Sequence, residues 1–323
     1  MKIVRSLILL TLFIVGEVTA CDYCISSQGI SPIEVGSSGA RYDARYLYLG
    51  KMYDDGKEIV NSSDAEETYI THQVSMYYHI GGKFSASLNL PFVNRYESGD
   101  GVPPHGSLEN TIVSSQTPQH STSAKPYNYQ VNGLSDIAVY GRYRLLYDEE
   151  SSFFMTVSAG VKLPTGATNA VNDEGELLNP HIQAGTGSTD PLLGLDMFYG
   201  GGDYSVSLNL MSCYPTTGAQ NYQFGTMLNY SINGKYNLLN FGEMNSIIAA
   251  VGVSGELHAE ETMNSEAVAN TGGNTTYVFP GIQLLVGNMF TFDLSYHIPI
   301  IHELKGTQLG ESYKVMAGAQ YLF

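Results

Sequence analysis

The 323-residue sequence predicts an all-β fold, a transmembrane antiparallel β-barrel of about 12 strands, of the bacterial outer-membrane type. Three observations predict it. The chain ends on residues 313–323, where every second residue is aromatic, aliphatic or alanine, and period two over that length indicates a strand with one apolar face. Charged residues make up only 14% of the chain, and no segment after residue 20 has the ~18 apolar residues of a membrane helix. Alternating segments separated by turns recur along the chain.

The first 20 residues are typical of a secretory signal. Lys2 and Arg5 are basic, residues 7–15 are apolar, and small residues lead to Ala20. Residues 21–40 are then predicted to be a periplasmic lead-in, and residues 41–323 the transmembrane barrel.

The lead-in opens on a Cys-x-x-Cys pair, Cys21 and Cys24. Residues 18–21 resemble a lipobox, which would make Cys21 a lipidation site, but simple cleavage after Ala20 fits equally well. In an oxidising periplasm the pair would then form a local disulfide, and a redox or metal role is a third reading. Covalent haem attachment is excluded because no His follows Cys24. A four-cysteine zinc site is excluded because the chain has three cysteines. No metal and no cofactor are predicted.

Twelve strands are predicted from alternation and turn signals. They are 41–50, 68–80, 84–93, 135–147, 153–163, 189–199, 204–214, 221–232, 247–258, 275–286, 290–299 and 313–323. Long connections are expected at 51–67, 94–134, 165–188, 259–274 and 300–312, and tight turns lie between most of the others. Connections 215–220 and 233–246 depart from this alternation, which is otherwise that of a barrel with long extracellular loops. An even strand count places both termini on one side, predicted to be the periplasm.

The second face of each strand carries Ser, Gly, Asn and Thr with few charges. The outer sheet of a soluble sandwich would carry Lys and Glu there, so this face is interpreted as a confined polar lumen. The charged residues and histidines whose place in the alternation assigns them to this face are Arg41, Asp43, Arg45, Asp136, Arg142, Arg144, Lys162, Asp196, Glu256, His258, Asp293, His297 and Lys314. We expect Arg142 and Arg144, with Lys162 on the hairpin partner, to form a basic patch that sets solute selectivity. The alternative is that these charges pair and hold the strands.

Three segments carry a family resemblance. Residues 133–144 (GLSDIAVYGRYR), 160–166 (GVKLPTG) and 186–194 (TGSTDPLLG) resemble segments of the outer-membrane proteins labelled MetA-pathway of phenol degradation. The resemblance covers about residues 41–323 and implies a transporter or channel. It does not indicate a substrate.

The predicted function is an outer-membrane channel for passive uptake or efflux of a small solute through a narrow polar lumen. One alternative is a structural barrel that supports a periplasmic or extracellular partner, including a redox partner. A less favoured alternative is a lipid hydrolase, for which His72 and the pair His120-Ser121 are the candidate sites. The predicted partners are outer-membrane lipid, lipopolysaccharide and the solute. The formal charge of −16 argues against nucleic acid, and the sequence does not set the oligomeric state.

Overall fold

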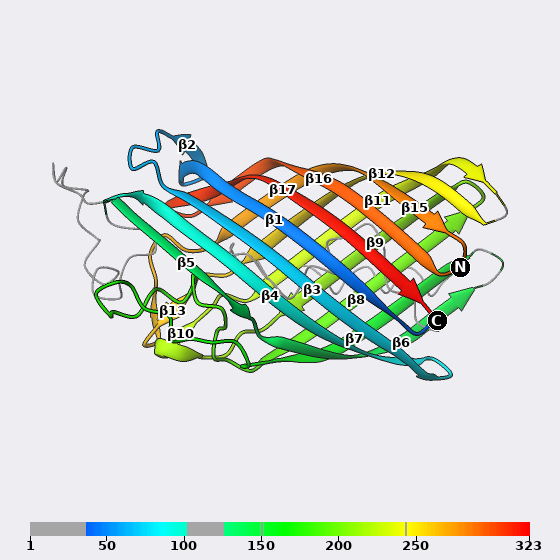
Figure 1. Cartoon of the computed structure of the whole chain (residues 1–323), viewed down its shortest axis with the longest axis horizontal. Coiled ribbons are helices and arrows are strands. Elements are labelled where there is room, and N and C mark those ends of the chain that lie inside the picture. The colour runs from blue at the N-terminus through cyan, green and yellow to red at the C-terminus, as the bar shows by residue number, and fades with distance from the viewer. Residues whose placement is uncertain (1–36, 102–125, 149, 151, 243) are drawn as a thin grey trace, which may run out of the picture.

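The structure is a computed structural model that describes residues 37–101, 126–148, 150, 152–242 and 244–323. Within these ranges, twelve antiparallel strands form one closed barrel, in which β17 pairs with β1 (Figure 1). The closing pair runs from Gly39 opposite Leu322 to Asp54 opposite Thr307. The predicted all-β barrel, closed by the last strand against the first, is therefore confirmed.

The barrel strands follow one another around the wall in chain order. They are β1 (Gly39–Asp54), β3 (Glu66–Gly81), β4 (Phe84–Asp100), β6 (Ile137–Asp148), β7 (Phe153–Leu163), β8 (Asp190–Gly201), β9 (Tyr204–Cys213), β11 (Met227–Phe241), β12 (Asn245–His258), β15 (Gly273–Val286), β16 (Phe290–Leu304) and β17 (Thr307–Leu322). Shorter strands are β2 (Lys57–Ile59), β5 (Pro126–Leu134), β10 (Tyr222–Gln223), β13 (Thr262–Met263) and β14 (Glu266–Ala267).

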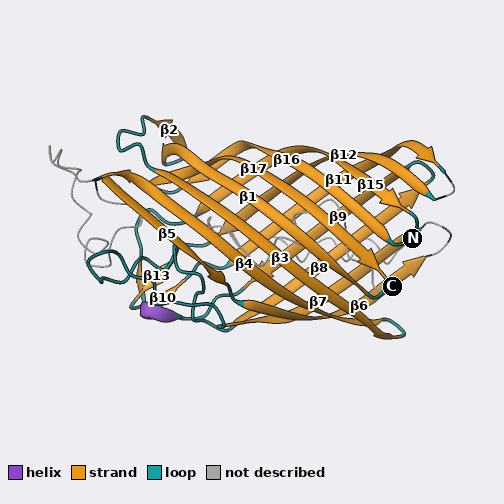
Figure 2. Cartoon of the chain, in the orientation of Figure 1, coloured by secondary structure: helices purple, strands orange, loops and turns teal. Residues whose placement is uncertain are grey.

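The two ends of the barrel differ. At the turn end, which holds the C-terminus, short connections join β3 to β4, β8 to β9, β11 to β12 and β15 to β16. At the loop end lie the longer connections and the short strands β2, β10 and β13 (Figure 2). The loop end therefore has the longer and more elaborate segments, as the alternation of connections predicts.

The wall is taller on the side of β4 than on the side of β7. The first part of β4 pairs with β6, and its second part, Phe92–Asp100, pairs with β5. Beyond the exposed pair Phe92 and Leu134, most outward positions of this second part are polar: Asn94 and Ser98 on β4, and the exposed Asn128 and Gln130 on β5. Because a lipid-facing surface is apolar, this part of the wall extends beyond the hydrocarbon of the membrane.

Below that level the outer face is apolar and the inner face is polar. Val74, Met76 and Ile80 of β3 are exposed on the outside, while the alternate residues Gln73 and Ser75 are buried. The same alternation holds on β16, where Leu294, Tyr296 and Ile298 are exposed. Among the residues that the structure describes, no helix is long and apolar enough to cross a membrane.

Two predicted boundaries are wrong. The strand predicted at 221–232 is β11, which begins at Met227 and continues to Phe241. An Asn-Gly pair such as Asn233-Gly234 is typical of a tight turn, yet Gly234 pairs with Val206 and Val251 inside the wall. The irregular turn predicted at 233–246 is thereby reduced to a short connection between Phe241 and Asn245.

The long connection predicted at 300–312 is also wrong, because only two residues separate β16 from β17. The prediction ended the strand at Pro299, and proline cannot donate a hydrogen bond to a strand ladder. Pro299 lies next to a register shift where it faces Tyr277, and pairing resumes at Ile301 opposite Thr276. A local irregularity thus accommodates the proline without ending the strand.

Candidate functional site

The lumen has two unlike walls. Buried charged and histidine side chains gather on one side, on β1, β12, β16 and β17: Arg41, Asp43, Arg45, Glu256, His258, Asp293, His297, Glu311 and Lys314. The facing strands β4, β7, β9 and β11 present buried hydroxyls and amides: Ser85, Ser87, Asn89, Thr156, Ser158, Ser207, Asn209, Asn229, Ser231 and Asn233. The candidate functional site is therefore the lumen, in which the side formed by β1, β12, β16 and β17 is mainly ionic and the facing side is mainly neutral, although Arg142 is buried there as well.

The Arg41 cluster consists of Arg41, Asp43 and Asp293. Arg41 Nε donates to Asp43 Oδ1 at 2.8 Å, and Nη1 and Nη2 donate to the two oxygens of Asp293 at 3.0 and 2.9 Å. Gly318 lies between the two carboxylates in the sheet, opposite Asp43 on β1 and Asp293 on β16. A Cβ at position 318 would lie 2.0 Å from Arg41 Nη2. Glycine is therefore needed there, because the guanidinium occupies the space of a side chain.

Lys314 crosses the charged wall near its middle. Its Nζ donates to Glu256 Oε1 on β12 at 2.9 Å and lies 3.9 Å from the centre of the Tyr277 ring. His258 Nε2 lies 3.7 Å from the other oxygen of Glu256. All of these side chains are fully or almost fully buried, so ion pairing and a cation–π contact together stabilise the lysine charge.

The predicted residues Arg45 and His297 lie in the same wall. Arg45 Nη2 approaches Thr71 Oγ1 of β3 at 3.4 Å. The ring nitrogens of His297 lie 3.2 Å from Ser254 Oγ and 3.0 Å from Ser295 Oγ, and the ring stacks on Phe279 with centroids 4.4 Å apart. His297 is thus held by two hydroxyls and an aromatic face.

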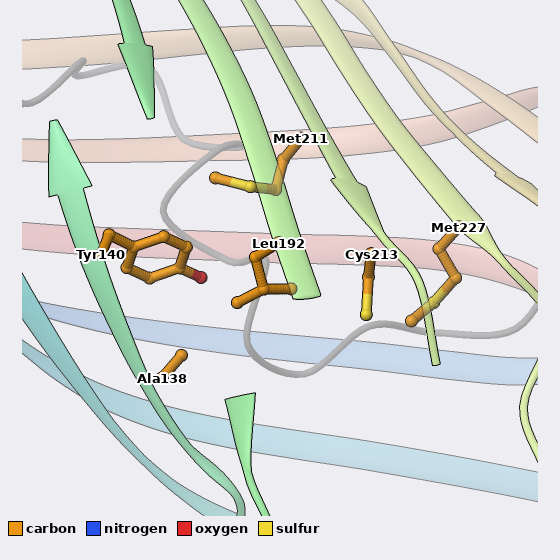
Figure 3. Packing of buried hydrophobic residues seen from close by; sticks show 6 residues of the cluster. All are labelled: Ala138, Tyr140, Leu192, Met211, Cys213 and Met227. Carbon is orange, nitrogen blue, oxygen red and sulfur yellow. The ribbon is translucent and has the colours of Figure 1, made fainter. Parts of the chain in front are cut away.

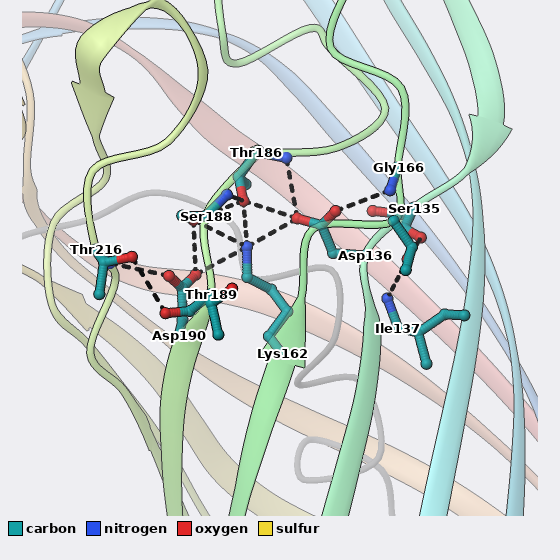
Figure 4. Close-up of polar contacts among 11 residues, drawn as sticks. Ser135, Asp136, Ile137, Lys162, Gly166, Thr186, Ser188, Thr189, Asp190 and Thr216 are labelled. Atoms are coloured by element: carbon teal, nitrogen blue, oxygen red, sulfur yellow. Dashed lines mark hydrogen bonds and ion pairs between the residues drawn. The ribbon is translucent and has the colours of Figure 1, made fainter.

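The Lys162 cluster lies at the loop end and consists of Asp136, Lys162, Thr186, Ser188 and Asp190 (Figure 4). Lys162 Nζ lies 2.7 Å from Asp136 Oδ2 and 2.8 Å from Asp190 Oδ2, and it also donates to both hydroxyls. The three segments singled out in the sequence each supply part of this cluster. The feature that they share is therefore a buried polar anchor and not a strand pattern alone.

Loop backbone completes the Lys162 cluster. Asp136 accepts hydrogen bonds from the backbone N–H groups of Gly166 and Thr186, at 3.0 and 2.9 Å. Asp190 accepts one from the N–H of Thr216 at 2.9 Å. The cluster consequently fixes the connections 164–189 and 214–226 to the loop ends of β7 and β8.

The predicted basic patch is not assembled. Lys162 lies opposite Ala138 and Arg142 opposite Ser158, which separates the two cations by four residues, or about 13 Å, along the strand. Arg142 is buried in the neutral wall. Arg144 is half-buried nearer the turn end, with its guanidinium carbon 5.1 Å from the centre of the Tyr147 ring. Asp196 accepts a hydrogen bond from Asn209 at 3.1 Å. A selectivity role for these residues stays a prediction.

An apolar patch interrupts the neutral wall. It consists of Ala138, Tyr140, Leu192, Met211, Cys213 and Met227, all buried on the inner side of β6, β8, β9 and β11 (Figure 3). Sequence reasoning missed this patch, although the parity that places Asp196 in the lumen also places Leu192 there. The lumen therefore offers an apolar surface as well as a polar one.

Three loop-end segments meet at His181, Tyr222 and Glu261. His181 Nε2 lies 2.7 Å from Glu261 Oε2, and the Tyr222 hydroxyl donates to the same oxygen. Burial and the Glu261 charge raise the pKa of Tyr222 well above its usual range, so the phenol remains a donor. This contact joins the connections 164–189, 214–226 and 259–272 over the lumen.

The cysteine predictions lie largely outside the described residues. Cys21 and Cys24 are among the residues that the structure does not describe. Cys213 is buried in the apolar patch. Within the described ranges, no group of three or more His, Cys, Asp or Glu side chains is arranged to hold a metal ion.

A closed barrel with an apolar outer face and a polar, charge-lined interior defines the class of bacterial outer-membrane β-barrel channels. The sequence model of the family described as "Putative MetA-pathway of phenol degradation" matches residues 58–312, and the chain belongs to that family. The resemblance carried by the three sequence segments is thereby confirmed.

One solved structure supports the same fold. The COG4313 outer membrane channel from Pseudomonas putida F1 is similar with a TM-score of 0.60 and 13% identity, over 95% of this chain and 100% of that one. A Pseudomonas aeruginosa FadL homologue gives a TM-score of 0.41 and 10% identity, over 95% and 99% of the two chains. No curated protein is a significant match. At these identities the likeness concerns the fold alone.

Proposed function

We propose that this protein is a passive outer-membrane channel for a small solute, and that it catalyses no reaction. The observation that carries the proposal is the inner surface of the barrel, which is lined around its circumference by buried polar and charged groups. Lining of this kind is what a water-filled path requires. The outer apolar band would contact membrane lipid, and the polar loop end would lie among lipopolysaccharide.

The lining also suggests the kind of solute. A charged wall on β1, β12, β16 and β17 faces the strands that carry the apolar patch. A solute with one polar or charged group and a small apolar part could contact both surfaces at once. We therefore propose small amphipathic molecules as the transported class.

Conductance tests the channel directly. The purified protein, inserted into planar lipid bilayers, should show discrete openings whose reversal potential in a salt gradient gives the ion preference. Insertion without conductance would favour the alternative of a structural barrel that binds a partner. Replacing Arg142, Arg144 and Lys162 with Ser should shift the preference toward cations, and an unchanged reversal potential would refute their predicted filter role.

We further propose that both termini lie in the periplasm and that the loop end faces outward. The signal-like N-terminus and the short turns beside the C-terminus support this orientation. An epitope inserted after Glu174, in a loop-end connection, should be accessible to antibody on intact cells. The same epitope inserted after Lys83, in a turn-end hairpin, should become accessible only after lysis. The reverse pattern would refute the orientation.

The contacts of His72 speak against the lipid-hydrolase alternative. His72 Nδ1 lies 2.6 Å from the Tyr42 hydroxyl, and the two rings stack with centroids 6.0 Å apart. Its hydrogen-bond partner is thus a phenol rather than the serine that such a hydrolase would use. The pair His120-Ser121 lies outside the described residues. A phospholipase assay with and without Ca²⁺ should give no hydrolysis.

A further inference from the structure

Two neighbouring strands of the neutral wall carry a block of serine and asparagine side chains. Ser207 of β9 lies directly opposite Asn233 of β11, and Asn209 lies opposite Ser231. All four side chains are on the inner face, and the four residues are between 0% and 3% exposed. The Ser207 hydroxyl donates to Asn233 Oδ1 at 3.0 Å. This serine–asparagine block therefore presents the lumen with uncharged groups that both donate and accept hydrogen bonds.

Two groups of the serine–asparagine block make no hydrogen bond to any residue that the structure describes. They are the Ser231 hydroxyl and the Asn233 Nδ2 amino group, and both atoms are buried. An unpaired buried polar group costs about 1–3 kcal/mol, and buried donors are normally paired for that reason. Since both groups lie on the inner face of a channel wall, a solute in the lumen can supply their missing partner.

Asp196 extends the block onto β8. It lies directly opposite Asn209, whose Nδ2 donates to Asp196 Oδ1 at 3.1 Å. Asp196 is only partly buried, so its carboxylate can also accept a hydrogen bond from a solute. Arg142 lies within electrostatic reach of Asp196, and their opposite charges offset each other. The combined surface therefore favours an uncharged solute over an ion.

The apolar patch adjoins the block on its loop-end side. Met211 follows Asn209 by two residues on β9, so the two side chains share the inner face about 7 Å apart. A Cβ at Gly194, two residues before Asp196 on β8, would lie 3.1 Å from Met211 Cε, which places the methionine side chain over that glycine. Leu192 continues the apolar surface along β8 (Figure 3). Hydrogen-bonding groups and hydrocarbon thus meet at one place in the wall.

We propose that the serine–asparagine block and Asp196 bind two neighbouring hydroxyl groups of an uncharged solute, while the apolar patch contacts its hydrocarbon part. The diol site, as we call it, consists of Asp196, Asn209, Met211, Ser231 and Asn233. One solute hydroxyl would donate to Asp196, and the other would accept from the Asn233 amide and bond with Ser231. Methionine suits the hydrocarbon part, because its unbranched thioether adapts to irregular shapes. The inference rests on the proposed function and deepens it, because it identifies the polar group of the transported amphipathic solute as a diol.

A ligand-observed NMR titration of the full-length protein tests the diol site. The detergent is zwitterionic, because glycoside detergents carry hydroxyl groups of their own. The probe is cis-cyclohexane-1,2-diol, and its dimethyl ether is the counterpart that keeps the ring and cannot donate a hydrogen bond. The wild-type protein should bind the diol saturably and the ether at least about tenfold more weakly, which corresponds to about 1.4 kcal/mol. Cyclohexanecarboxylate, an anion with the same ring, should also bind more weakly than the diol.

Two variants locate the binding, and a third is the matched control. Ser231→Ala removes one hydroxyl and should weaken diol binding about threefold. Asp196→Asn keeps the size of the side chain but removes the charge of the acceptor, and it should weaken binding about fivefold. The control is Ser87→Ala, because the Ser87 hydroxyl is equally buried and likewise makes no hydrogen bond to a described residue. Ser87 lies on β4, five strands from β11 around the barrel, so its loss should leave the affinity unchanged.

The diol site is overturned if the wild type shows no saturable binding of the diol, or if both site variants keep its affinity. Ether or carboxylate binding as tight as that of the diol would also overturn it, and so would a loss in Ser87→Ala as large as in Ser231→Ala. Circular dichroism of each variant shows that the barrel is folded. Because binding is measured without conductance, a barrel that binds the diol but does not conduct refutes the channel alone. A barrel that conducts but does not bind the diol refutes the diol site alone.

Discussion

The Lys162 cluster and the Arg41 cluster have the same formal composition and different surroundings. Each places one buried cation between two buried aspartates. The aspartates of the Lys162 cluster also accept hydrogen bonds from backbone N–H groups of three loop residues. The contacts of Arg41 are side-chain bonds to carboxylates on β1 and β16, made over Gly318 inside the lumen.

This difference assigns different roles to two similar groups. Backbone donors fix the carboxylates of the Lys162 cluster in place, so its charge serves to anchor the loop-end connections. In the proposed channel the Arg41 cluster would line the path of a solute, because side chains alone can exchange partners with water or ions. Four changes test the distinction, and they are ordered here by the size of the expected effect.

The largest effect is expected for Lys162→Met. The change leaves Asp136 and Asp190, each with a 2% exposed side chain, without their cation. Removal of one partner from a buried ion pair typically costs about 3–5 kcal/mol. Urea unfolding in lipid vesicles, followed by circular dichroism because the chain lacks tryptophan, should show a loss of that size. A loss below about 1 kcal/mol would contradict the anchoring role.

Arg41→Met should cost less, about 3 kcal/mol, because water in the lumen can rehydrate Asp43 and Asp293. It should also shift the reversal potential toward cations, since two carboxylates remain in the path. Lys162→Met should leave the reversal potential nearly unchanged. If both variants shift selectivity equally, the distinction between anchor and lining fails.

Gly318→Ala should cost about 1–3 kcal/mol through overpacking. The new Cβ would lie 2.0 Å from Arg41 Nη2 and 2.6 Å from Asp293 Oδ2. Gly234→Ala is the matched control, because a Cβ at that position in β11 meets nothing within 4 Å. Equal unfolding free energies for the two variants would show that the Arg41 guanidinium moves aside at no measurable cost in stability.

The smallest effect is expected for Lys51→Met. Lys51 Nζ lies 2.9 Å from Glu58 Oε2, but the two side chains are 49% and 54% exposed. Exposed pairs contribute at most about 1 kcal/mol, so the unfolding curve should nearly match that of the wild type. A loss as large as that of Lys162→Met would mean that burial is not what distinguishes these pairs.

The alternation of apolar and polar residues predicted most of the barrel wall, because lipid and lumen impose opposite polarities on successive residues of a strand. It succeeded for β3 and β16, where apolar residues repeat on the outer face. It missed β5 and the second half of β4, since these segments extend beyond the hydrocarbon of the membrane. Their outward residues, such as Asn94 and Gln130, are polar and therefore do not alternate in polarity with the inner face. The direct pairing of Glu67 with Glu97 was missed as well, because both residues lie in segments predicted to be long connections, 51–67 and 94–134.

The sequence by itself determined the fold class, the closure by the last strand and the lumen-facing parity of Arg41, Asp293 and Lys162, because period two fixes the face of a residue. Only the tertiary structure decided which charges meet. Arg41 binds Asp293 across 252 positions in the chain, and Lys162 lies apart from Arg142. Contact between distant strands depends on register and closure, and neither quantity can be read from the polarity of single strands.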